Sequence, residues 1–92
     1  MEDPEEIFYY DGQDDNSEVP LHVRRTLTHV RFDSSVKEIP PRLFQFCFDL
    51  VTVELNEGLK FIKEDAFHGC TSLRQLIIPS SVKKIESRAF LH

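Results

Sequence analysis

The chain has 92 residues and a formal net charge of −5, a length that suits one small domain or part of a larger protein. Eight of its 16 acidic residues lie in residues 1–18, which contain no Lys or Arg, whereas the rest of the chain carries 11 basic and eight acidic side chains. Nucleic-acid binding needs a clustered basic face, and a surplus of three positive charges spread along the chain excludes that class of partner.

The distribution of apolar residues excludes two further classes of protein. No apolar run approaches the ~18 residues of a membrane-spanning helix, so we expect no membrane partner. The first ten residues, MEDPEEIFYY, are acidic where a secretory signal would be basic and then apolar. A cytoplasmic location is therefore favoured for the chain as given, and its two cysteines are expected to be free thiols.

Residues 1–26 are expected to form an acidic N-terminal arm and an irregular capping rung. The run at residues 7–10 is aromatic and β-prone, and the Asp-Gly pair after it is a turn signal. Later in the chain, equivalent residues recur at a constant interval. Counting one such interval back from Val30 and Phe32 leads to Ile7 and Tyr9. These two side chains should therefore face inward in a strand that caps the stack. The alternative is a short strand packed elsewhere on the core.

Residues 18–26 match the later pattern poorly. Arg24 stands where the next two rungs have cysteine. We interpret it as a substitution typical of a terminal rung, whose outer side faces water.

From Leu27 onward the sequence repeats at a constant interval, in rungs 27–49, 50–72 and 73–92, the last of which is cut short. A repeat of this length buries its apolar side only against neighbouring copies, which predicts a solenoid of about three to four rungs. The Phe44/Phe67/Phe90 column should form a ladder in the core. The apolar columns are Leu27/Leu50/Leu73, Val30/Val53/Leu76, Phe32/Leu55/Ile78, Val36/Leu59/Val82, Ile39/Ile62/Ile85, Leu43/Ala66/Ala89, Phe44/Phe67/Phe90 and Cys47/Cys70.

Each rung is expected to begin with a short parallel strand. In rung 50–72, Val53 and Leu55 alternate with Thr52 and Glu54, so the first pair should face the core and the second pair the solvent. Residues 56–58 then turn the chain, residues 59–62 are extended or turn-like, and residues 66–70 are a helical or 3₁₀ turn, since their apolar side chains are three apart.

Outward side chains from successive strands should form one continuous surface, the face that repeat solenoids use for partners. Its columns are His29/Thr52/Gln75, Arg31/Glu54/Ile77 and Asp33/Asn56/Pro79, of which the first two make up the candidate partner-binding face. Arg31 beside Glu54 is expected to form an exposed salt bridge. Ile77 is the apolar residue in these two columns, which indicates a contact site. The alternative is a solvated sheet face without a ligand.

The segments SSVKEIPPRLFQFCFDL, EGLKFIKEDAFHGCTSL and PSSVKKIESRAF resemble the BspA-type leucine-rich repeats. That repeat combines a strand, a Pro-Ser-Ser-Val-x-x-Ile-like turn and an Ala-Phe-x-x-Cys-x-x-Leu segment. The resemblance covers residues 27–92 and implies an α/β-type repeat solenoid, a right-handed leucine-rich-repeat superhelix with short parallel strands and 3₁₀ or helical turns. Phe46-Cys47-Phe48, where Gly-Cys-Thr is more usual, and Pro40-Pro41 depart from it. Family members include surface and adhesion-type bacterial proteins, so the resemblance identifies the repeat type and no particular function.

No catalytic, cofactor or metal site is expected. Cys47 and Cys70 should stack on adjacent rungs roughly one strand spacing (~4.8 Å) apart, within disulfide reach. Buried free thiols are the favoured interpretation, with an oxidised pair or a metal site as the alternatives. The four histidines show no recognisable spacing to an acid and a nucleophile, and the chain has no glycine-rich phosphate loop.

The expected function is therefore a non-catalytic protein–protein interaction module that binds a protein or peptide on its strand face. The alternative is a structural spacer or cap of a longer leucine-rich-repeat array, with no partner of its own. The sequence stops in mid-rung at His92, which leaves Ile85 and Phe90 without a cap. This predicts either a fragment of a longer array, which is favoured, or self-association through the uncapped C-terminal rung.

Overall fold

The computed structural model describes residues 7–12, 19 and 21–90, except for the side chains of residues 21 and 22. Most of this part of the chain consists of turns and irregular segments, because each rung has only two short strands. The elements in chain order are β1 (Phe8–Tyr10), α1 (Leu21–Thr26), β2 (His29–Phe32), β3 (Glu38–Ile39), β4 (Thr52–Glu54), β5 (Phe61–Ile62), β6 (Gln75–Leu76) and β7 (Lys84–Ile85).

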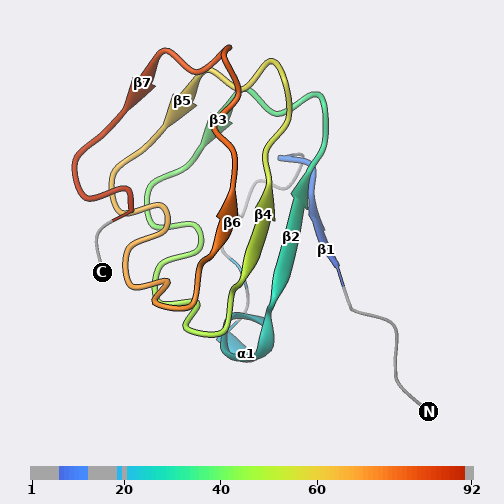
Figure 1. Ribbon diagram of the computed structural model, residues 1–92, viewed down its shortest axis with the longest axis vertical. Coiled ribbons are helices and arrows are strands. Elements are labelled where there is room, and N and C mark those ends of the chain that lie inside the picture. Colours follow the sequence, from blue (N-terminus) through green and yellow to red (C-terminus); the bar gives the residue numbers. More distant parts are fainter. Residues whose placement is uncertain (1–6, 13–18, 20, 91–92) are drawn as a thin grey trace.

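The strands form two parallel sheets on two sides of a solenoid (Figure 1). One sheet has the order β1-β2-β4-β6 and the other the order β3-β5-β7. His29 pairs with Thr52, and Thr52 with Gln75, so each rung advances the chain by the interval of the sequence repeat. The predicted leucine-rich-repeat solenoid is confirmed. The second half of the extended segment expected at 59–62 is the strand β5, which pairs with its copies on both sides.

The predicted apolar columns form the core of the solenoid. In rungs 27–49 and 50–72, every column member is buried except Leu55, which is partly buried; Ile78 and Ile85 of rung 73–92 are exposed. The predicted phenylalanine ladder is confirmed. Phe67 stacks on Phe44 with ring centroids 5.6 Å apart, and on Phe90 at 5.2 Å.

Strand β1 covers the end of this ladder, as the capping interpretation expects, but in a different register. Phe8 pairs with Val30 and Tyr10 with Phe32, an offset one position shorter than the repeat interval. Such a shift moves every side chain to the other face of a strand. The prediction that Tyr9 faces inward was therefore wrong: its side chain is 63% exposed, whereas Phe8 and Tyr10 pack edge-on against Phe44.

Helix α1 leads into β2. The side chain of its residue Arg24 is not fully exposed to solvent. Arg24 is partly buried, and its guanidinium group donates hydrogen bonds to the carbonyl of Gln45 at 2.5 Å and to that of Val19 at 3.3 Å. The interpretation of Arg24 as an outward-facing substitution is corrected accordingly. Arg24 stands in the place of a small apolar side chain, and its long cationic side chain donates hydrogen bonds to carbonyl groups at the edge of the core.

The corners of the solenoid are tandem turns, not the helical or 3₁₀ turns that the spacing predicted. The turn residues Arg42, Asp65 and Arg88 occupy one column, and all three have left-handed φ angles, of 62°, 58° and 58°. Their backbones also bond between rungs: the amides of Phe44 and Phe67 donate to the carbonyls of Ala66 and Ala89, at 2.8 and 2.7 Å. A helix would satisfy these groups within one rung, and this corner would then carry no backbone hydrogen bonds between rungs.

A second left-handed column contains Phe46 and Gly69, with φ angles of 64° and 83°. A Cβ atom added to Gly69 would lie 2.5 Å from Cδ1 of Phe46, so the phenyl ring sits directly on the glycine. Phe46 also stacks on Phe48, with ring centroids 5.9 Å apart, and the two rings are 48% and 55% exposed. The departure from Gly-Cys-Thr thus places two partly exposed aromatic rings at one corner of the solenoid.

Candidate partner-binding face

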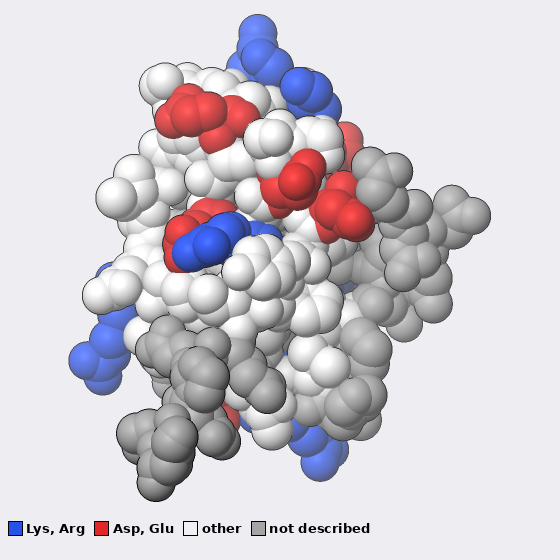
Figure 2. All heavy atoms as spheres, turned by 90° about the vertical axis from the view of Figure 1, so that its right-hand side faces the viewer, with Lys and Arg blue, Asp and Glu red and all other residues white. Residues whose placement is uncertain are grey.

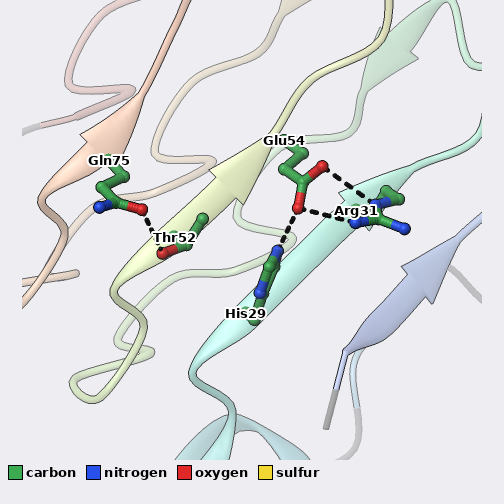
Figure 3. A network of polar contacts seen from close by, with 5 residues as sticks. All are labelled: His29, Arg31, Thr52, Glu54 and Gln75. Carbon is green, nitrogen blue, oxygen red and sulfur yellow. Dashed lines mark hydrogen bonds and ion pairs between the residues drawn. The ribbon is translucent and has the colours of Figure 1, made fainter. Parts of the chain in front are cut away.

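The outward side chains of β2, β4 and β6 form a network of polar contacts (Figure 3). Arg31 Nε donates to Glu54 Oε1 at 3.0 Å, and Arg31 Nη2 to Glu54 Oε2 at 3.1 Å. His29 Nε2 also contacts Glu54 Oε2. One strand further, Thr52 Oγ1 donates to Gln75 Oε1 at 3.1 Å. The parallel register brings these five predicted site residues together, because paired strands place residues of successive rungs side by side.

Both charges of the central pair are stabilised by this geometry. The hydrogen bond and the charge of Glu54 raise the pKa of Arg31 above its ordinary value. The hydrogen bonds from Arg31 and His29 hold the pKa of Glu54 below its ordinary value. The expected salt bridge is present, and Glu54 stays ionised at neutral pH with both oxygens engaged.

Tyr9 is a member of this face that the sequence interpretation missed. It pairs with Arg31 across β1 and β2, and the guanidinium carbon of Arg31 lies 5.7 Å from the centre of the Tyr9 ring. A signal for this placement was present in the sequence: Asp11 follows Tyr10 as Asp33 follows Phe32. Alignment on the turn residues gives the observed register, whereas alignment on the repeat interval does not.

A groove of about 840 Å³ lies over β4 and β6, next to the polar network. Five of the six predicted residues line it, namely His29, Thr52, Glu54, Gln75 and Ile77, while Arg31 lies outside on the β1 side. The side chain of Ile77 is 83% exposed there, which makes it the most exposed large apolar side chain among the described residues.

The third predicted outward column is mostly buried. Asn56 is buried, with 8% of its surface exposed, and its amide nitrogen donates to the carbonyl of Val36 at 2.8 Å. Pro79 is buried as well, and only Asp33 is exposed. The expectation that Asn56 and Pro79 point outward was wrong, because both side chains are buried. The Asn56 side chain folds back onto the preceding rung, whereas Pro79 lines the groove.

Charges of both signs are mixed on the surface around β1. Figure 2 views the molecule from the right-hand side of Figure 1, where β1 lies, and shows basic side chains scattered among acidic ones on the visible described surface.

Residues 22–92 match the family model of the BspA type leucine rich repeat region (6 copies). This chain belongs to the BspA-type leucine-rich repeat family. No curated protein and no solved structure matches the chain significantly.

Leucine-rich-repeat solenoids generally act as protein-binding scaffolds, because successive rungs present one extended surface. In this BspA-type repeat, no group of three or more metal-ligating side chains occurs among the described residues. The helix in the described part of the chain is α1, which has six residues. No helix there is long and apolar enough to cross a membrane.

The cysteine column of this BspA-type repeat is buried and unbonded. Cys47 and Cys70 are free thiols, exposed by 0% and 1%. The Cys70 Sγ donates to the carbonyl of Phe44 at 3.1 Å. The hydrogen bond between the two thiols, together with burial, raises the pKa of Cys47 above its ordinary value. The Cys47 thiol therefore reacts slowly as a nucleophile, and the burial of both side chains shows that the column packs in the core.

Proposed function

We propose that the chain is a non-catalytic protein-interaction module that binds a protein or peptide on the outer face of the β1-β2-β4-β6 sheet. The groove over β4 and β6, in which the exposed Ile77 lies beside ordered polar side chains, carries this proposal. In the same proposal, residues 27–92 are the binding solenoid and residues 1–26 an acidic arm with a capping rung.

The polar network supports a role in binding, because its side chains are ordered before a ligand arrives. Arg31, Glu54 and His29 hold one another, and Thr52 holds Gln75. A partner then loses less side-chain entropy on binding than it would on a surface of freely rotating groups. Ile77 adds an apolar contact, and removal of such a side chain from water favours association.

The experiment compares capture of partner proteins by the intact chain and by a variant with Thr52→Ala, Glu54→Ala and Gln75→Ala. A matched control carries Thr71→Ala and Glu64→Ala, two exposed positions outside the groove. We expect the first variant to lose a defined partner while its circular dichroism spectrum stays unchanged, and the control to retain that partner. Equal capture by both variants would contradict the proposed face.

The alternative function is a spacer or cap within a longer leucine-rich-repeat array. Backbone hydrogen bonds between rungs, such as that from the Lys60 amide to the Lys37 carbonyl at 2.8 Å, support this role because they stack rungs without using the outward side chains. A chain that captures no partner and whose groove substitutions change no measured property would favour the spacer.

A further inference from the structure

Two exposed charges of opposite sign lie at opposite ends of the groove. Arg74 directly precedes β6, whereas Glu57 follows the C-terminal end of β4, and both line the groove. Neither side chain forms an ion pair within the described part of the chain, in contrast to Arg31 and Glu54. The groove therefore offers one unused cation and one unused anion.

The distance between the two ends is set by the strand geometry. The amide of Arg74 donates to the carbonyl of Val51 at 2.9 Å, so Arg74 lies level with the start of β4. Six residues separate that level from Glu57, which corresponds to at most about 20 Å. An extended peptide rises about 3.3 Å per residue, so five or six peptide residues span the groove.

The floor between the two charges is partly apolar. Ile77 is 83% exposed, and Leu55 and Leu76 line the groove as partly buried side chains. Thr52 and Gln75 bond to each other, so their polar groups are already partly satisfied. An apolar side chain in the middle of a ligand would find its contact at Ile77.

We propose that the groove takes an extended peptide segment with an acidic side chain at one end, a basic side chain at the other, and an apolar residue between them. The acidic end pairs with Arg74 and the basic end with Glu57, so charge complementarity fixes the occupant. A polyanion is disfavoured because Glu54 and Glu57 line the same groove and would repel it. This inference rests on the proposed function and specifies the ligand of that face.

The test uses four blocked hexapeptides that differ only at their two ends. The probe is acetyl-Asp-Thr-Leu-Thr-Thr-Lys-amide, and the matched peptides carry Asp at both ends, Lys at both ends, or Ser at both ends. Binding is followed by amide chemical shifts of the intact ¹⁵N-labelled chain at low ionic strength. We expect the Asp/Lys peptide to bind most tightly, with shifts at Thr52, Gln75 and Ile77. Each mismatched end should weaken binding by about two- to five-fold.

Charge reversal in the chain should change this preference in a defined order. Arg74→Glu should favour the Lys/Lys peptide, and Glu57→Lys the Asp/Asp peptide. The double variant exchanges the two charges of the groove, so a fifth peptide with Lys at the first position and Asp at the last should bind it more tightly than the probe does. Lys83→Glu is the control, because Lys83 is exposed and lies outside the groove, and it should leave the order of affinities unchanged.

Three results would overturn the inference. Peptide shifts on the same face whose order does not follow the charge reversals would refute the charge-matched ligand and leave the proposed function standing. Equal shifts with all four peptides would do the same. Shifts at the groove that depend on protein concentration alone would show a second copy of the chain as the occupant. The proposed function itself is tested by a separate measurement, which is partner capture by the variant with substitutions at Thr52, Glu54 and Gln75.

Discussion

Replacement of Phe67 by alanine removes the middle ring of the aromatic ladder that joins three rungs. Phe67 is 1% exposed and lies nearly parallel to both neighbours, with interplanar angles of 14° to Phe44 and 3° to Phe90. The cavity left behind cannot close easily, because the Phe67 amide and its neighbours hold the rungs at a fixed spacing through backbone hydrogen bonds. A buried Phe→Ala change of this kind costs about 3–5 kcal/mol.

That loss is large compared with the stability available. A chain of 92 residues is expected to unfold with a free energy of about 5–14 kcal/mol. At this size, each 1 kcal/mol shifts the melting temperature by about 4–8 °C, so Phe67→Ala should lower it by at least about 12 °C or unfold the chain.

Thermal unfolding followed by circular dichroism measures this shift, and Phe48→Ala supplies the matched control. Phe48 has the same chemistry, but its side chain is 55% exposed, and within the described part of the chain its aromatic contact is the stacked ring of Phe46. The control should lose no more than about 1 kcal/mol. A melting temperature of Phe67→Ala that equals that of Phe48→Ala would refute the assignment of the ladder to the core.

The other predictions concern a carboxylate, a glycine and a thiol. Because Arg31 lowers the pKa of Glu54, this pair stabilises the fold at neutral pH and ceases to do so as the pH falls through the lowered pKa. In Arg31→Ala, NMR titration should show a higher pKa for Glu54. Gly69→Ala should cost at least about 1–2 kcal/mol, since φ is 83°, and in a Phe46→Ala background urea unfolding should show a smaller loss; strictly additive losses would contradict the ring contact. Cys47 should react slowly with a thiol reagent in the native protein and rapidly in urea, and equal rates would refute its burial.

The period of the sequence predicted the parts of this fold that depend on stacked copies. The columns of apolar residues became the core, and His29, Thr52 and Gln75 became neighbours, because equal spacing places equivalent residues side by side in a parallel sheet. The salt bridge between Arg31 and Glu54 followed from the same register. Periodicity alone was sufficient for these features, since each is a relation between one rung and the next.

Features that depend on a single turn could not be predicted in this way. The burial of Asn56 requires free carbonyl groups on the preceding rung, and nothing in the residue type indicates them. The two-residue strands, such as Phe61–Ile62, are too short to show an alternation of polar and apolar side chains. Tyr9 was misplaced because the residues of β1 were aligned with those of β2 by the repeat interval. The terminal strand β1 lies one residue closer to β2 in sequence than that interval, so it breaks the period.

The contact between Phe46 and Gly69 gives the array a direction. A ring that occupies the space of a missing Cβ can be followed only by a rung with glycine at that position. The rungs are therefore not exchangeable units, although their cores are nearly identical in pattern. A designer who lengthens this protein by copying rung 27–49 behind itself would place a second phenylalanine where the first one needs empty space, whereas copies of rung 50–72 would meet no such obstacle at this position.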